Sequence, residues 1–325
     1  MEVQQLAKQE KGKLGSKREW QKRKILILFL TIPMLFLLYF TVYPIITMFY
    51  YSFTDWKGSV SPYDFVGVYN YKNIFTTESY RNVFVTAGYY LLAGLLQQVL
   101  SLFLAVIMNK KLRGSGFFKG IIFFPFIMNG VAVAMAFRMF YQIGGGLDTL
   151  MNVAGFGDYI KVWISDPKTC NFALAFIFLW KNVGYSFLIY LGTMQSISSE
   201  YYDAAAIDGA GRWTVFGKIT LPLLRPMLLY VAITSLIGGL QMFDLPYLMS
   251  NPAGASYNSV YTVVMYLYKF GFTTGTTQTG YASAIAYVLF LIILAVSIIQ
   301  LKVFNQDEEK AAARRAKKRA LSKTK

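Results

Sequence analysis

The sequence contains no histidine and only one cysteine, Cys170. Without histidine there is no Ser–His or Cys–His nucleophilic pair, no ordinary zinc site and no histidine-ligated haem. A lone cysteine excludes an intrachain disulfide and a cysteine-based metal site. The P-loop pattern G-x-x-x-x-G-K-[ST] is also missing, which excludes that way of holding nucleotide phosphate. We expect no catalytic, metal-binding or cofactor-binding residue; paired acids or a lysine are the enzymatic alternative that stays open.

Charge is scarce as well. Charged residues make up 15% of the 325 residues and hydrophobic residues 55%, whereas an ordinary soluble domain is about a quarter charged. A run of about 20 apolar residues is enough to span a bilayer. We expect six transmembrane helices, at about 25–52, 82–109, 117–141, 170–194, 227–249 and 279–304. Residues 25–304 then form a transmembrane domain between basic tails at 1–24 and 305–325.

The basic residues indicate the orientation. Of the 32 Lys and Arg residues, 24 lie in the N-terminal tail, at 110–119, at 195–225 and from Lys302 onward. Six spans place all these segments on one side, and the positive-inside rule makes that side the cytoplasm. This bias explains the net charge of +16, and contact with anionic headgroups is enough to explain the basic tail. We therefore expect no nucleic-acid partner, although residues 314–319 leave that alternative open.

The 195–225 segment is a polar island between two apolar runs. Ser198 or Ser199 can cap a short helix with acidic residues in its first turn. Three alanines follow, and Gly209 ends the helix. A second short helix is expected next, and Pro222 and Pro226 are expected to end it and redirect the chain. This helix–glycine–helix unit has the shape to enter a groove on a partner; an amphipathic connector without a partner is the alternative.

Residues 203–222 resemble the EAA loop of ABC-importer permeases, on the pattern E-A-A-x-x-D-G-A…F-x-x-I-x-L-P of the carbohydrate-uptake branch. In that family the loop sits in a cleft of the ATP-hydrolysing subunit. Asp203 replaces the family's glutamate, so the charge is kept and the reach is shorter. The resemblance implies these ATPase-coupling residues: Asp203, Ala204, Ala205, Asp208, Gly209, Ile219, Leu221 and Pro222.

Three charged side chains interrupt the apolar runs: Arg138, Lys181 and Asp244. A charge at mid-bilayer costs about 2.5–3.5 kcal/mol, so such residues indicate function. Lys181 and Asp244 either pair with each other or belong to a polar cavity with aromatic walls. Pro125 and Pro246 indicate backbone breaks beside a cavity or simple packing kinks.

Two further segments resemble the same family. Residues 180–184 look like the fourth-span W-x-x-x-G pattern, and residues 241–247 look like the fifth-span Q-x-F-D segment. Spans four to six line the sugar pocket in that family. The resemblance therefore implies these substrate-binding residues: Trp180, Asn182, Tyr185, Gln241, Asp244 and Tyr247. Residues 65–71 resemble the F-V-G-x-x-N-Y signature, which we interpret as a turn stabilised by Gly67 and Asn70.

The expected fold class is an all-α integral membrane protein with six transmembrane helices and the type I ABC-importer permease (MetI-like) fold. The resemblance implies a permease subunit for sugar or oligosaccharide uptake, in the plasma membrane of a bacterium or archaeon. It also implies four partners besides the bilayer: a second, different permease chain, two copies of an ABC ATPase, an extracellular solute-binding protein and a sugar. ATP and Mg belong on the ATPase. The alternatives are a permease for amino acids or phosphate, and a membrane enzyme or scaffold.

Overall fold

The computed structural model describes residues 20, 22–58, 63–110, 113–250, 257–273 and 277–323. Apart from turns and an isolated bridge between Thr54 and Phe65, these residues form helices. The elements are η1 (Leu38–Val42), α2 (Tyr43–Tyr51), α3 (Tyr69–Thr76), α4 (Glu78–Met108), α5 (Ser115–Ile127), α6 (Gly130–Tyr141), α7 (Gly146–Val153), η2 (Gly157–Tyr159), α8 (Cys170–Gln195), α9 (Ser199–Ile207), α10 (Arg212–Val215), η3 (Phe216–Thr220), α11 (Leu221–Leu240), α12 (Asp244–Met249), η4 (Tyr257–Val260), α13 (Val263–Phe272) and α14 (Thr279–Lys323).

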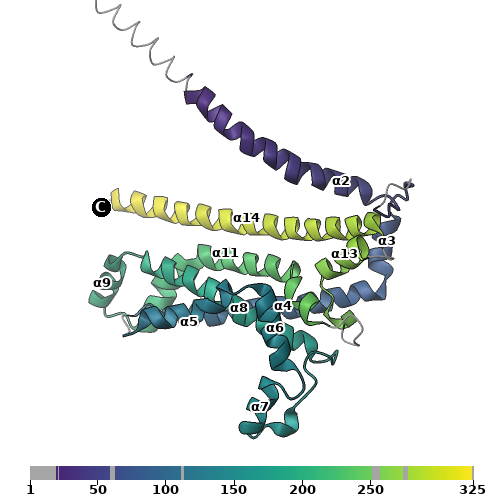
Figure 1. The fold of residues 1–325 in the computed structure, drawn as a ribbon. Helices are drawn as coiled ribbons and strands as arrows, with labels where there is room; N and C mark the ends of the chain where they lie inside the picture. Colours follow the sequence, from purple (N-terminus) through teal and green to yellow (C-terminus); the bar gives the residue numbers. More distant parts are fainter. Residues whose placement is uncertain are drawn as a thin grey trace, which may run out of the picture.

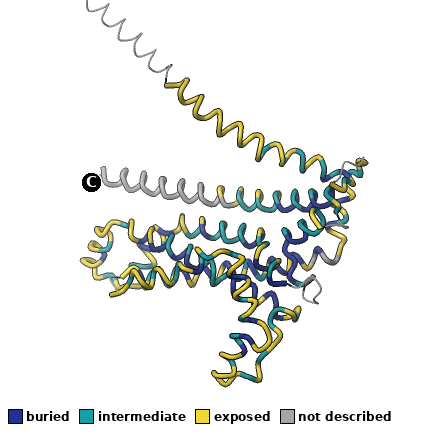
Figure 2. The backbone as a smooth tube through the Cα atoms, viewed as in Figure 1, coloured by how far each residue is buried: buried dark blue, intermediate teal, exposed yellow. Residues whose placement is uncertain are grey.

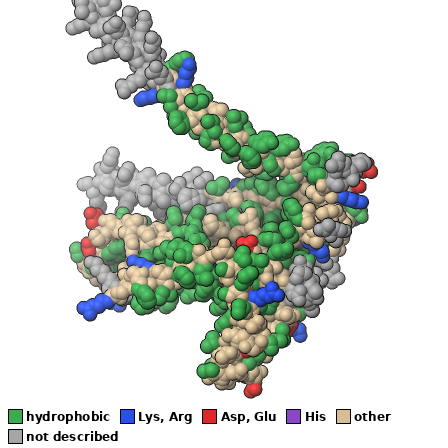
Figure 3. Space-filling model, viewed as in Figure 1, with side chains coloured by type: hydrophobic (Ala, Val, Ile, Leu, Met, Phe, Trp, Pro, Cys, Tyr) green, Lys and Arg blue, Asp and Glu red, His purple; other side chains and the backbone are tan. Residues whose placement is uncertain are grey.

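Five helical segments are long and apolar enough to cross a membrane, and the bent pair α5 and α6 makes a sixth if it counts as one span. Together with the helical content, this confirms the all-α membrane architecture. The first segment, Lys22–Tyr51, contains η1 and α2 and diverges from the other helices (Figure 1). It is exposed along most of its length (Figure 2) and is covered by hydrophobic side chains (Figure 3).

The centre of the bundle is α8. It packs against α4, α5 and α11, while α14 covers α11 (Figure 1). Half of the most apolar stretch of α8 is buried, whereas none of the corresponding stretch of the first segment is. Because α8 contacts α4, α5 and α11, its side chains help to decide how these three helices are arranged.

Three expected helices have different bounds. The helix expected at 117–141 is two helices, α5 and α6, which meet at 96°. The helix expected at 227–249 begins at Leu221, stops at Leu240 and resumes as the short α12. The helix expected at 279–304 continues to Lys323, through the segment interpreted as a tail. Hydropathy reports where apolar residues lie and does not report bends or polar extensions, which explains these differences.

Residues 65–71 form the predicted turn. Gly67 has φ +57°, in the region that favours glycine. The Asn70 side chain is buried and its Nδ2 donates hydrogen bonds to the carbonyls of Ser52, at 2.9 Å, and Thr54, at 2.8 Å. Asn70 thereby joins the end of the first span to α3.

The contact between α8 and α5 depends on Gly184. A Cβ at this position would collide with the carbonyl oxygen of Ile122 and lie 2.7 Å from the Cα of Phe123. Small residues allow membrane helices to approach this closely. This close contact places the end of α5, and the bend that follows it, beside α8.

We predict that Gly184→Ala destabilises the protein by about 1–3 kcal/mol because the added methyl group overpacks the α5–α8 contact. Gly192→Ala is the matched control, since it lies on the same helix and a Cβ there meets nothing within 4 Å. Both changes raise helix propensity equally. The purified assembly is heated, and size-exclusion chromatography measures the fraction that stays assembled at each temperature. The midpoints of the two variants are then compared. Equal midpoints for the two variants would show that the close approach is not needed.

Candidate functional site

Two interruptions in the helices lie next to each other. The first separates α5 from α6, where Met128 has an extended backbone and the Asn129 side chain accepts a hydrogen bond of 2.8 Å from the Val131 N–H. The second separates α11 from α12, and α12 packs against α6. Irregular backbone at membrane depth is tolerated where it is buried in protein or lines a cavity. Discontinuous helices of this kind form the substrate sites of many transporters.

Two of the charged residues of the spans meet at this point. A Cβ placed on Gly130, the first residue of α6, would lie 3.4 Å from Asp244 Oδ2 and 3.5 Å from Lys181 Nζ. The two groups therefore flank the same glycine, one from α12 and the other from α8. Within the described residues they form no salt bridge with each other, so the simple pair left open by the sequence is not formed here. Arg138 lies elsewhere, in a smaller cavity beside the loop that follows α6.

Aromatic rings surround the two interruptions. Tyr247 stacks on Phe243 with 4.8 Å between ring centroids, and Tyr268 of α13 meets it edge-on at 5.3 Å. Tyr185 stacks on Phe126 of α5 at 5.0 Å. These rings give flat apolar surfaces close to the charged groups.

Not all predicted substrate residues lie together. Asp244 lies beside Lys181, Trp180 meets Phe137 of α6 edge-on at 5.1 Å, and Gln241 is exposed in the second interruption. Asn182 donates its Nδ2 hydrogen bond to the Phe178 carbonyl of its own helix, at 2.8 Å. The six residues are thus distributed around the interruptions and do not form one continuous wall.

The sequence analysis missed a buried polar network that supports this region. Gln97 of α4 is 1% exposed, and its Nε2 donates to the Asn182 carbonyl at 3.0 Å and to Ser186 Oγ at 2.6 Å. Ser101 Oγ donates to the Val183 carbonyl at 2.9 Å. The sequence could have predicted it, because Gln97 and Ser101 lie within an apolar run and uncharged polar side chains also need hydrogen-bond partners in a membrane. The network fixes the part of α8 that carries Lys181.

The expected helix–glycine–helix unit is present between α8 and α11. The Ser198 side chain caps α9 by accepting from the Glu200 N–H at 3.3 Å. At the other end Gly209 has φ +67°, and the N–H groups of Gly209 and Ala210 donate to the carbonyls of Ala206 and Ala205. This is the Schellman arrangement that ends helices at glycine. Both helix ends are therefore satisfied locally.

The second part of this unit differs from the expectation. The prolines do not reset the chain: α10 continues through η3 into α11, with Pro222 in the first turn of α11 and Pro226 inside it. In the π turn η3, the Leu221 N–H donates to the Phe216 carbonyl. The π turn shifts the backbone hydrogen-bond pattern just before Pro222, which has no N–H to donate. The helix can therefore continue through this proline.

Two large apolar side chains of the unit are almost fully exposed. Ile207 is 88% exposed and Trp213 is 87% exposed, on either side of Gly209. The predicted coupling residues are distributed as follows: Asp203, Ala204, Asp208, Gly209 and Pro222 are exposed, Ile219 and Leu221 are half-buried, and Ala205 is buried. Both side chains are therefore available for contact with a partner.

Comparison with known proteins agrees with this geometry. The model of the family described as "Binding-protein-dependent transport system inner membrane component" matches residues 97–306. The chain is 32% identical over 281 residues to the multiple sugar-binding transport system permease protein MsmF of Streptococcus mutans, covering 86% of this chain and 95% of that one. It is 28% identical to the trehalose/maltose transport system permease protein MalF of Thermococcus litoralis, covering 90% and 99%.

A solved structure shows the same fold. The crystal structure of a bacterial ABC transporter involved in the import of the polysaccharide alginate contains a chain with TM-score 0.74 and 21% identity, covering 88% of this chain and 99% of that chain. The bent third span, the interrupted fifth span and the α9–α10 unit therefore belong to a multi-pass membrane protein of known architecture. The chain is a member of the binding-protein-dependent transport system inner membrane component family.

Proposed function

We propose that this chain is a membrane-spanning subunit of an ATP-driven importer for a sugar or oligosaccharide, and that its two helix interruptions form part of the transport path. The observation that carries the proposal is the meeting of both interruptions at Gly130, with Lys181 and Asp244 on either side. The names of the MsmF and MalF relatives point to sugars as the transported class.

The chemistry around the interruptions suits a sugar. Carboxylate, ammonium and amide groups exchange hydrogen bonds with hydroxyls, while aromatic faces pack against the apolar face of a sugar ring. Asp244 and Lys181 supply the first kind of group, and Tyr247 and Tyr185 supply the second. A site built to hydrogen-bond hydroxyls discriminates strongly against solutes that lack them.

The α9–α10 unit is proposed to dock on a separate ATPase. Ile207 and Trp213 expose apolar surface on either side of Gly209, and burying a side chain of this size stabilises a complex by about 1.5–3 kcal/mol. Two copies of the ATPase, with their ATP and Mg, would serve the two permease subunits. In this proposal both termini and the α9–α10 unit face the cytoplasm, as the distribution of basic residues predicts.

The continuous helix from Arg212 to Leu240 supports a mechanism. Movement of the docked unit passes through η3 into α11, because no break separates them. The far end of α11 is the second interruption, which lies beside α6. ATP binding on the partner would thereby shift the site between inward and outward states, and hydrolysis would reset it.

The remaining partners follow from surfaces that the chain leaves uncovered. The first span buries none of its most apolar stretch, so a second permease chain and lipid are proposed to cover it. The family description implies a solute-binding protein, which we place against the loops at the end of the bundle opposite α9.

We predict that Ile207→Asp reduces the amount of ATPase that co-purifies with the permease by about tenfold, because a charge replaces the apolar contact. Val153→Asp is the matched control. Val153 is also the last residue of a short helix and is 84% exposed, but it lies on α7. Quantitative co-purification from the native host measures both variants. Equal losses for the two, or none for Ile207→Asp, would contradict the docking assignment.

We predict that Asp244→Asn lowers sugar uptake by about tenfold or more without loss of assembly, since hydrogen bonds to charged groups contribute about 1.5–3 kcal/mol. Asp158→Asn, an exposed carboxylate in η2, serves as the control. Uptake of radiolabelled sugars, amino acids and phosphate by proteoliposomes gives the substrate class and the effect together. Transport of amino acids or phosphate alone would reject the sugar assignment.

A further inference from the structure

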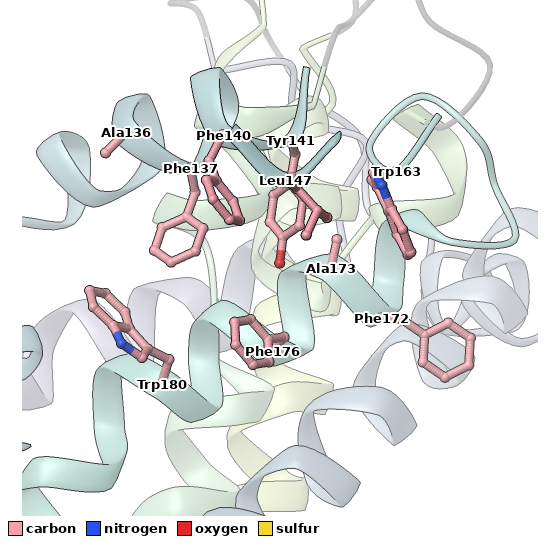
Figure 4. Close-up of a pocket in the computed structure, with 10 residues that line it drawn as sticks. All are labelled: Ala136, Phe137, Phe140, Tyr141, Leu147, Trp163, Phe172, Ala173, Phe176 and Trp180. Atoms are coloured by element: carbon pink, nitrogen blue, oxygen red, sulfur yellow. The ribbon is translucent and has the colours of Figure 1, made fainter. Parts of the chain in front are cut away.

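An open groove lies between α6 and α8. Its volume is about 650 Å³, and Leu147 of α7 and Trp163 of the following loop also line it (Figure 4). None of its ten lining residues is charged, and seven carry aromatic rings. A gap between helices forfeits the dispersion contacts that a filled space would provide. The groove therefore suits an apolar chain that packs against the rings.

The groove follows α8 inward from one end of its span. Its rings on α8 are Phe172, Phe176 and Trp180, which recur at every fourth residue and so share one face of the helix. The span begins at Cys170, and Phe172 and Phe176 are 58% and 52% exposed. From Phe172 to Trp180 the helix rises by about 12 Å. The groove thus starts near a membrane surface and runs in the direction taken by the acyl chains of lipids.

A pocket with a positive charge adjoins the groove. Arg138 and Gln142 of α6 and Ser165 of the next loop line this cavity, which has a volume of about 250 Å³. Tyr141 lines both the pocket and the groove, so the two share one wall. Both spaces lie at the C-terminal half of α6, and a long arginine side chain in a span extends its charged group toward the membrane surface. The polar pocket therefore lies next to an apolar groove, as the two parts of a lipid require.

The charge in this pocket is not neutralised by the chain. Within the described residues, Arg138 forms no salt bridge. Two acidic side chains between α6 and α8 accept backbone hydrogen bonds instead: Asp148 Oδ2 from the Gly144 N–H at 2.8 Å, and Asp166 Oδ1 from the Lys168 N–H at 2.9 Å. A guanidinium group binds a phosphate through two parallel hydrogen bonds. The pocket therefore offers a site for a phosphate group beside the groove.

We propose that the groove and the Arg138 pocket together bind one anionic phospholipid. Its phosphate lies at Arg138, and one of its acyl chains lies along Phe172, Phe176 and Trp180. The bound lipid fills the gap between α6 and α8. It thereby supports α6, whose other contact within the bundle is α12.

A helix of a second permease chain is the other candidate occupant. An apolar helix would cover the aromatic rings equally well, but it would leave Arg138 without an anionic partner. A phospholipid supplies the anion and the apolar chain in one molecule, with the charged part at the membrane surface. The arrangement of charge and rings therefore favours the lipid.

Brominated lipids test the proposal, because bromine atoms on an acyl chain quench only the tryptophans that they approach closely. The whole transporter is placed in phosphatidylcholine nanodiscs that contain a minority of phosphatidylglycerol or phosphatidylcholine brominated halfway along its acyl chains. The quenching that disappears in Trp180→Phe is assigned to the groove. In the wild type, brominated phosphatidylglycerol should quench Trp180 at a mole fraction about threefold to tenfold lower than brominated phosphatidylcholine requires.

The headgroup contact is tested by changing the arginine. Arg138→Gln should remove the preference for phosphatidylglycerol, and Arg138→Lys, which keeps the charge, should retain part of it. Arg113→Gln is the matched control, because Arg113 is also exposed but precedes α5 and lies outside the groove and the pocket. The control should keep the full preference.

Three results would overturn the proposal. Equal quenching by the two brominated lipids in the wild type would show that the headgroup is not recognised. An unchanged preference in Arg138→Gln would place the phosphate elsewhere. No quenching of Trp180 by either lipid would show that another protein chain covers the groove. None of these results depends on which solute is transported, so the import function is tested separately by Asp244→Asn.

Discussion

The constraint on which this structure depends is that a bilayer offers no hydrogen bonds to an unwound backbone. The chain nevertheless interrupts two spans, at residues 128–129 and 241–243, and it places both interruptions side by side. The Asn129 side chain satisfies the first turn of α6, while Gln97 and Ser101 bind the carbonyls of α8 nearby. Polar side chains are thus concentrated where the helices stop, and a polar solute could find hydrogen-bond partners there.

The same constraint explains how a distant surface can act on that region. A helix that is satisfied internally behaves as a stiff rod, and the segment from Arg212 to Leu240 is continuous through the π turn at 216–220. One end carries the exposed Trp213, and the other end is the second interruption. Gly184 keeps α5 against α8, so the first interruption is held beside the central helix. In the proposed mechanism, coupling and transport therefore use the same helix, α11.

Some of this arrangement follows from local sequence, and some does not. The caps at Ser198 and Gly209 were predictable because each is determined by residues within one or two turns. The charges at Lys181 and Asp244 were predictable as costly exceptions in apolar runs. Their meeting at Gly130 was not, because the 96° bend at Asn129 depends on contacts with distant helices. Pro222 was misinterpreted as a stop, since nothing in the sequence shows a π turn that accommodates it.

The most direct test of the central claim is a cryo-electron microscopy structure of the whole assembly with a transported sugar trapped inside. The account predicts density for a sugar ring in contact with Asp244 and Lys181, beside Gly130, with both interruptions unwound. Sugar density in another part of the permease, with Asp244 and Lys181 joined in a salt bridge, would contradict it.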